Sequence, residues 1–286
     1  MQNLYLNFRA AAIDGGIVEP YLLEGDGNQP QPALRALQWH ELPPLFAGKN
    51  VLFLSHGFNV NYAEGARALG RLDNRLALPE PDLFIGILWP GDAWLPVVNY
   101  PFEGNDANHC GRLLADFCDR WLATAQSISF ASHSLGARLI LSAAQRMSRR
   151  LHLLCLTAAA VDHDVLEAEF KRAAANAERI VVLASRDDQV LKLAFRVGDP
   201  LSDLLQGESI TARPALGYGG PSAGSAHLVE RPWQIRSGYG HGDYLPPSVT
   251  HGHGMAAGGG VHRAGLLRPA ARLATLKLRQ GGKSTP

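Results

Sequence analysis

Long apolar runs and an excess of charge of one sign are both missing from this 286-residue sequence. No run approaches the roughly 20 apolar residues that a membrane-spanning helix needs, so we expect no transmembrane segment. The 27 basic and 26 acidic residues leave a formal net charge of +1, which argues against a nucleic-acid partner. The first residues, MQNLYLNFRAAAIDGG, lack the basic and apolar regions of a secretory signal.

Cysteines and cofactor motifs are also sparse. The three cysteines, Cys110, Cys118 and Cys155, show no metal-like spacing, so we expect buried free thiols in a reducing cytoplasm. Neither a G-x-x-x-x-G-K-[ST] loop nor a strand-borne G-x-G-x-x-G is present, which argues against nucleotide binding. The runs DHD at 162–164 and HGHG at 251–254 supply no full ligand set. We therefore expect no metal and no cofactor.

Apolar, β-rich runs alternate with helical patterns along most of the chain. This alternation predicts βαβ units, and hence an α/β three-layer sandwich with a mostly parallel twisted sheet flanked by helices. A further strand is expected at the sheet edge over residues 4–8. The other expected strands lie within 50–58, 82–91, 128–131, 151–162 and 178–188, and the expected helices within 62–78, 107–125, 135–145 and 163–177.

The pattern weakens after Leu193. Residues 195–230 are rich in Gly, Pro and Ser, and we expect them to form a loop or lid-like excursion from a single domain that spans 1–247. The run RPWQIR at 231–236 is a candidate last strand. Residues 248–286 are expected to form a flexible or helical C-terminal tail.

In the run SISFASHSLGARLILSAAQ, residues 127–145, a strand-like pattern changes to a helical pattern at Ser134. The tight turn forces Ser134 into an uncommon backbone conformation and projects its Oγ from the carboxyl edge of the sheet. Close approach of strand and helix requires small residues two positions away, and Ser132 and Gly136 meet this need. Serine is also a favoured helix N-cap, but the small neighbours and the upstream dipeptide His56-Gly57 favour a nucleophile.

Four segments now give the chain a resemblance to the α/β-hydrolase fold family, specifically to its serine esterases and lipases. They are LFLSHGF, ASHSLGARL, VVLASRDDQVL and GYGHGDYL, in the family order of oxyanion loop, nucleophile, acid and histidine. With GILWPGD, a loop that contains tyrosine and LTAAAVDHDVL, the chain is also similar to a little-characterised group of bacterial hydrolases. The resemblance implies cofactor-independent hydrolase chemistry and names no substrate.

A serine hydroxyl needs a base to take its proton, and the resemblance places that base after the last strand. There His241 lies between Gly240 and Gly242, which would let its loop approach the serine closely. His251 and His253 are the alternatives, in a segment richer still in glycine.

The third member of such a triad fixes the tautomer of the histidine and stabilises the imidazolium. Asp188 matches the family position, because one residue separates it from the apolar pair Val190-Leu191. Alternatively, Asp187 contacts the histidine and Asp188 caps the next helix. Asp162 and Asp164, after the preceding strand, are further candidates for the acid.

Acyl transfer also needs donors aimed at the developing oxyanion. We expect these donors to be the backbone N–H groups of Leu135, directly after the nucleophile, and of Phe58, after the sequence SHG. His56 is expected to support that loop, and His133 to be an ordinary packed histidine.

The expected function is hydrolysis of a small-molecule ester through an acyl-enzyme at Ser134. The segment 92–106 is unusually apolar for a loop, and Trp94 and Tyr100 are expected to line the acyl side of the pocket. These residues would alternatively pack on the sheet edge. The alternatives for function are a catalytically silent scaffold, or an amidase or acyltransferase that uses the same triad.

Overall fold

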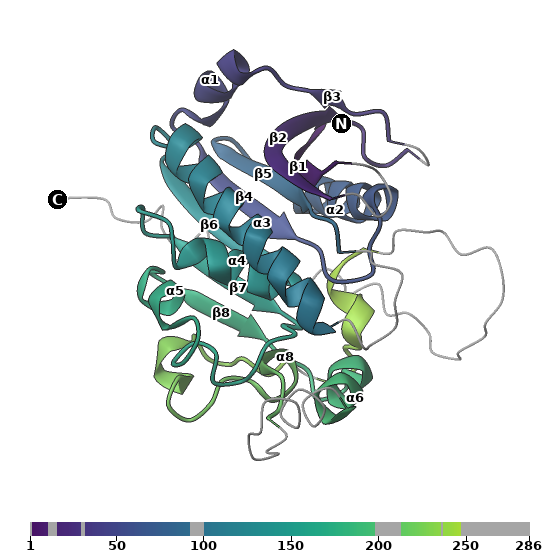
Figure 1. The fold of residues 1–286 in the computed structure, drawn as a ribbon, viewed down its shortest axis with the longest axis vertical. Coiled ribbons are helices and arrows are strands. Elements are labelled where there is room, and N and C mark those ends of the chain that lie inside the picture. The colour runs from purple at the N-terminus through teal and green to yellow at the C-terminus, as the bar shows by residue number, and fades with distance from the viewer. Residues whose placement is uncertain are drawn as a thin grey trace.

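The computed structural model places an eight-stranded sheet at the centre of the molecule (Figure 1). The strand order is β3-β2-β1-β5-β4-β6-β7-β8. The pairs β1–β2 and β2–β3 are antiparallel, and all other neighbours are parallel. The structure describes residues 2–10, 16–29, 32–91, 100–197, 213–235 and 237–246.

The elements have the following bounds. The strands are β1 Asn3–Arg9, β2 Ile17–Gly25, β3 Arg35–Ala36, β4 Asn50–Ser55, β5 Asp82–Leu88, β6 Ser127–His133, β7 Leu153–Thr157 and β8 Ile180–Leu183. The α-helices are α1 Leu42–Phe46, α2 Tyr62–Leu76, α3 Tyr100–Trp121, α4 Gly136–Ala144, α5 Lys171–Ala175, α6 Gln189–Val197 and α8 Leu216–Gly219. Short 3-10 helices are η1 Trp39–Glu41, η3 Ala226–Leu228 and η4 His241–Tyr244.

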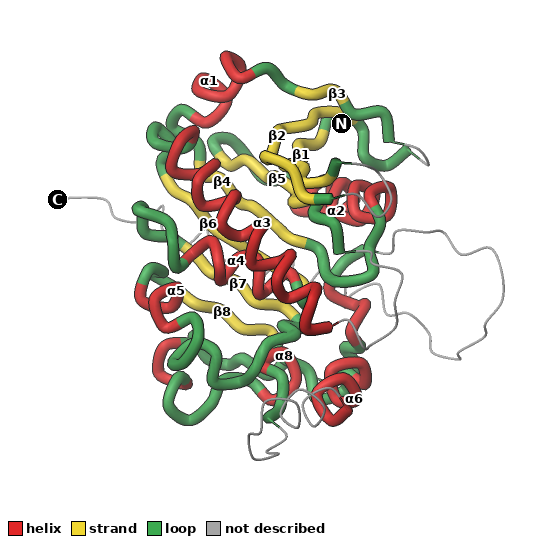
Figure 2. The backbone as a smooth tube through the Cα atoms, in the orientation of Figure 1, coloured by secondary structure: helices red, strands yellow, loops and turns green. Residues whose placement is uncertain are grey.

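Alternate residues of the central strands enter two separate apolar clusters, one on each face of the sheet, because strand side chains point to opposite sides in turn. On the face covered by α3 and α4, Phe53 and Phe130 pack edge to face with ring centroids 5.8 Å apart. On the face covered by α2 and α6, Leu54 and Ala131 are buried. Each large apolar side chain so buried contributes about 1.5–3 kcal/mol. The predicted three-layer α/β architecture is confirmed, with α3 and α4 in front of the sheet in Figure 2.

The prediction of an edge strand at residues 4–8 is wrong in its position. This strand, β1, lies inside the sheet between β2 and β5. The sequence of β2, IVEPYLLEG, contains two glutamates and a proline that obscure the strand pattern, so the sequence does not reveal the two antiparallel strands beyond β1.

Three further segments differ from expectation. The helix predicted over 163–177 is reduced to α5, and residues 163–170 form turns instead. The candidate strand at 231–236 contributes an isolated bridge between Gln234 and Ala184. The segment 92–106, expected to be a loop, includes the start of α3, so its residues from Tyr100 onward are helical. In the first two cases, main-chain hydrogen bonds to distant residues override the local preference of the sequence: the N–H of His163 donates to the carbonyl of Pro214, and the N–H of Ile235 donates to the carbonyl of Ala184.

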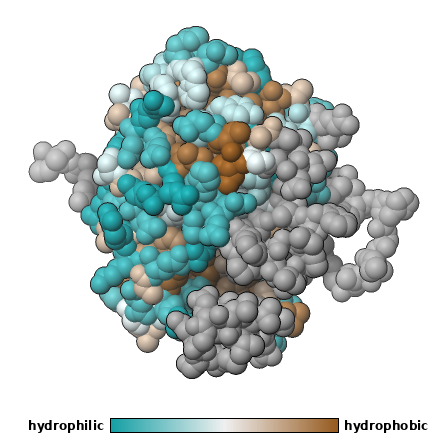
Figure 3. All heavy atoms as spheres, viewed as in Figure 1, coloured by the Kyte–Doolittle hydropathy of each residue, from teal (hydrophilic) through white to brown (hydrophobic). Residues whose placement is uncertain are grey.

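Hydrophilic residues cover most of the described surface in the view of Figure 3. Among the described residues, no helix combines the length and the apolar character needed to cross a bilayer. The predicted tail, 248–286, lies outside the described residues, as does the part of the predicted excursion at 198–212.

Candidate active site

Ser134 occupies the sharp turn between β6 and α4 in a left-handed backbone conformation, with φ of 53°. For a residue with a Cβ this conformation costs about 1–2 kcal/mol. The backbone N–H of Ser134 donates to the carbonyl of Thr157 at 3.1 Å. Its carbonyl accepts from the N–H groups of Ala137 at 3.0 Å and Ala160 at 3.2 Å. Because both the N–H and the carbonyl of Ser134 are hydrogen-bonded, the strained backbone conformation is held in place.

Two glycines allow the chain to pack tightly around this turn. A Cβ added to Gly136 would lie 2.4 Å from the carbonyl oxygen of His56 and 2.7 Å from Ser55 Oγ. A Cβ added to Gly57 would lie 2.8 Å from the Cβ of Ser134. Glycine at these positions therefore lets α4 approach the end of β4, and lets the loop after β4 lie directly against the serine.

We expect Gly136→Ala to lower the free energy of unfolding by about 1–3 kcal/mol, because the new methyl group collides with backbone that cannot rotate away. Chemical denaturation measures the change. Gly16→Ala is the matched control, since a Cβ there meets nothing within 4 Å and φ is not positive. Equal stability of the two variants would show that the turn is less tightly packed than described.

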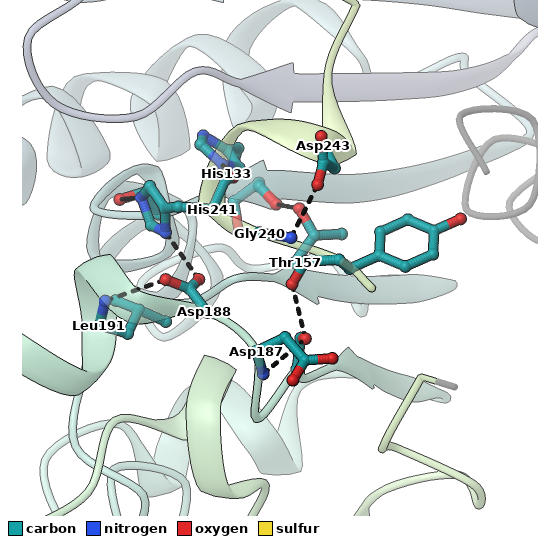
Figure 4. A network of polar contacts seen from close by, with 12 residues as sticks. His133, Thr157, Asp187, Asp188, Leu191, Gly240, His241 and Asp243 are labelled. Carbon is teal, nitrogen blue, oxygen red and sulfur yellow. Dashed lines mark hydrogen bonds and ion pairs between the residues drawn. The ribbon is translucent and has the colours of Figure 1, made fainter. Parts of the chain in front are cut away.

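Three side chains from different elements form one hydrogen-bonded series at the carboxyl edge of the sheet. Ser134 Oγ lies 2.9 Å from Nε2 of His241, and Nδ1 of His241 lies 2.8 Å from Oδ2 of Asp188. Figure 4 shows the contact between His241 and Asp188. Asp188 is fully buried, whereas the His241 side chain is 17% exposed. A carboxylate only accepts, so Nδ1 carries the proton and Nε2 is left to accept from the serine hydroxyl.

The two aspartates after β8 have separate contacts. Asp188 contacts His241 with Oδ2 and accepts the N–H of Leu191 at 2.9 Å with Oδ1, so it also caps the start of α6. The Asp187 carboxylate instead accepts the N–H of Gly238 at 2.7 Å. The structure thus gives Asp188 both of the contacts that the sequence leaves divided between two residues.

Among the described residues, the remaining candidate acids, Asp162 and Asp164, are not hydrogen-bonded to this series of side chains. Asp162 forms a backbone bridge with Ala215, and within the described residues it makes no hydrogen bond to His241. Burial and the nearby Asp164 raise the pKa of its carboxyl group. His251 and His253 lie outside the described residues. In the same described part of the chain, no group of three or more His, Cys, Asp or Glu side chains could hold a metal ion.

Ser134 does not cap α4, because the N-cap position is Leu135 and no side chain caps it. Among the described residues, no backbone carbonyl accepts a hydrogen bond from the backbone N–H of Leu135 or of Phe58. Both groups lie beside the serine, one at the start of α4 and one directly after Gly57. The positive end of the α4 dipole adds to their attraction for an anion.

The chain beyond Phe58 is anchored by its neighbours. Asn59 has φ of 57°, which asparagine tolerates better than most residues, and its N–H donates to the carbonyl of Gly91 at 2.5 Å. Two residues later, Asn61 and Glu64 form a reciprocal capping box at the start of α2. These contacts fix the loop that presents the N–H of Phe58.

His133 does more than pack beside the turn. Its Nε2 donates to the backbone carbonyl of His241 at 2.7 Å, and the two imidazole centroids lie 4.9 Å apart. Burial, with a contribution from nearby His241, lowers the pKa of His133 from 6.5 to about 4, although its hydrogen bond and Asp188 act in the opposite direction. The ring is therefore neutral near pH 7.

We expect acid to destabilise the folded protein partly through His133. Its pKa is about 4 when folded and 6.5 when unfolded, so between these values the unfolded chain binds more protons and stability falls as pH falls. The full loss, reached below pH 4, is about 3 kcal/mol. Chemical denaturation from pH 7 to 4 should show a steeper decline for the parent than for His133→Gln. Parallel curves would contradict this expectation.

The predicted pocket residues are not placed. Trp94 lies outside the described residues. Tyr100 begins α3, and its side chain is also outside the described part of the structure. The sequence patterns do not point to Ser185, whose hydroxyl donates to the carbonyl of Tyr239 at 2.6 Å. Its only signal in the sequence is a polar residue at the carboxyl end of a strand.

Comparison with known families agrees with the fold. A family described as an alpha/beta hydrolase of unknown function (DUF900) matches residues 45–208, more than half of the chain. The chain belongs to this α/β-hydrolase family. The matched residues of this α/β hydrolase include Phe58, Ser134 and Asp188, whereas His241 lies beyond them. No curated protein shows significant similarity to the chain.

Proposed function

We propose that this protein is a serine hydrolase that cleaves a carboxylic ester through an acyl-enzyme formed on Ser134. The observation that carries the proposal is the single series of hydrogen bonds from Ser134 through His241 to the buried Asp188. A nucleophile within reach of a base, with the base oriented by a third group, is the arrangement that covalent catalysis requires.

In the first half of the reaction, Nε2 of His241 takes the hydroxyl proton as Oγ of Ser134 attacks the ester carbonyl carbon. The carbonyl oxygen becomes an oxyanion, and the N–H groups of Leu135 and Phe58 donate to it. Asp188 stabilises the imidazolium. As the tetrahedral intermediate collapses, the imidazolium returns its proton to the leaving alkoxide, and the ester C–O bond breaks.

The second half removes the acyl group by the same steps with water in place of serine. His241 takes a proton from water as its oxygen attacks the acyl carbon, and the same two N–H groups stabilise the new oxyanion. The imidazolium then protonates Oγ of Ser134, which leaves, so the carboxylic acid departs and the enzyme is restored. No cofactor takes part in this scheme.

A small-molecule ester is the proposed substrate, with its acyl chain against Trp94 and Tyr100. This part of the proposal rests on the apolar composition of residues 92–106 and on the position of the segment in the chain, shortly after the end of β5.

A panel of nitrophenyl esters of increasing acyl length tests the proposal. We expect turnover by the parent protein and none above background by Ser134→Ala. Ser132→Ala is the matched control, because this neighbouring hydroxyl is buried and has no hydrogen-bond partner among the described residues. We expect this control to hydrolyse the esters at close to the parent rate.

A folded parent protein without turnover at any acyl length would contradict the proposal and favour a silent scaffold. Faster cleavage of matched anilides, or transfer of the acyl group to an added alcohol in preference to water, would redirect it to an amidase or an acyltransferase.

A further inference from the structure

Two side chains that follow β8 hold the first half of the loop that carries His241. The hydroxyl of Ser185 donates to the carbonyl of Tyr239 at 2.6 Å, and the carboxylate of Asp187 accepts the N–H of Gly238 at 2.7 Å. In both contacts a side chain after β8 binds a main-chain group of the loop. The contacts therefore fix the path of the loop backbone and do not depend on the side chains of the loop.

The second half of the loop is held from β6 and from within the loop itself. His133, the last residue of β6, donates through Nε2 to the carbonyl of His241 at 2.7 Å. Asp243 accepts the N–H of Gly240 at 2.7 Å (Figure 4). Each of the four consecutive residues 238–241 therefore has one main-chain group fixed by a side chain.

This loop needs such contacts because its sequence is glycine-rich. Gly238 has φ of 96°, and a Cβ added there would meet nothing within 4 Å. Packing therefore does not hold the chain at this point, and an unrestrained glycine segment has high conformational entropy. Tyr239 and Tyr244 are buried and anchor the loop on either side of His241. Between them, the position of the peptide depends on hydrogen bonds.

The clamping residues are sequence neighbours of the proposed triad. The end of β6 supplies His133, which holds the main chain of residue 241, and Ser134, which contacts the imidazole. The segment after β8 supplies Asp187, which holds the main chain at residue 238, and Asp188, which contacts the other imidazole nitrogen. Each strand end thus makes two adjacent contacts, one to the ring and one to the backbone that carries it.

We propose that His133 and Asp187 are positioning residues that clamp the main chain of the loop 238–241 and so fix the base for the reaction. This inference rests on the proposed function, since it concerns how His241 reaches Ser134. Displacement of a reacting group by about 1 Å lowers rates by up to about 100-fold. Loss of a clamp contact is therefore expected to lower kcat and to leave substrate binding almost unchanged.

The test compares disruptive and conservative variants at both positions. Asp187→Ala and His133→Phe each remove one main-chain contact, whereas Asp187→Asn keeps an oxygen acceptor and His133→Gln keeps a nitrogen donor. We expect kcat to fall about tenfold or more in the disruptive pair, with KM within about twofold of the parent, and to recover in the conservative pair. The rate of fluorophosphonate labelling of Ser134 should follow kcat, because it needs the same base.

Asp187 and Arg186 are both exposed, so Arg186→Ala is a matched control that should keep the parent kcat. A parent protein that is never labelled at Ser134 would overturn the proposed function and this inference together. A labelled parent whose disruptive variants are labelled at the parent rate, and lose only melting temperature, would overturn the inference alone. Should His133→Phe fail to fold, the surface variant Asp187→Ala still decides between these results.

Discussion

Replacing His241 with alanine is expected to lower kcat for ester hydrolysis by about four to six orders of magnitude, the range found when one member of a catalytic triad is removed. The Oγ of Ser134 then loses the partner that lies 2.9 Å away, and among the described residues no other group hydrogen-bonded to Oγ remains to take its proton. KM should change little, because the imidazole acts mainly on the transition state. Steady-state kinetics with an activated ester measures both constants.

The control for this variant is a histidine that the sequence alone leaves as an alternative base. His253→Ala should keep the parent kcat, and so should His251→Ala. Loss of activity in either of these variants, together with an active His241→Ala, would show that the base lies in the segment after residue 247. That result would contradict a catalytic role for the contact between His241 and Ser134.

Asp188→Asn is expected to lower kcat by about 10⁴-fold with little effect on folding. The amide oxygen can still accept the N–H of Leu191 and cap α6, so the melting temperature should stay close to that of the parent. An amide group facing Nδ1 of His241, however, stabilises the tautomer that carries its proton on Nε2, which cannot accept from serine. Kinetics and thermal melting of the same sample separate the two effects.

Asp162→Asn and Asp187→Asn are the matched carboxylate controls, and both should retain activity. Asp162 makes no hydrogen bond to His241 in the described structure, and the amide at position 187 keeps its acceptor for Gly238. An inactive Asp162→Asn beside an active Asp188→Asn would assign the acid to the segment after β7.

The parts of the fold that follow local rules could be predicted from the sequence. Parallel strands buried on both faces give continuous apolar runs, so β4 to β8 are visible as strands. The turn at Ser134 is visible because its small neighbours, Ser132 and Gly136, leave few other conformations for a strand that passes directly into a helix. Since parallel strands end at one edge of the sheet, the residues after them could be expected to meet there.

The parts that depend on non-local contacts could not be predicted. Strand β2 contains two glutamates and a proline, and its place in the sheet is set by pairing with β1. The segment 163–170 has good helix formers but forms turns, one of which joins the N–H of Phe170 to the carbonyl of Val165. The contacts of His133 and Asp187 reach backbone groups, and a backbone acceptor or donor has no signature in the sequence of its partner.

Peptide mapping after reaction with a fluorophosphonate tests the central claim most directly, because the reagent forms a stable bond with an activated serine. The geometry predicts a single adduct, on Ser134, that is absent from Ser134→Ala and forms far more slowly in His241→Ala. An adduct on another residue of the parent protein, or labelling that survives the Ser134→Ala substitution, would contradict the claim that this serine is the nucleophile.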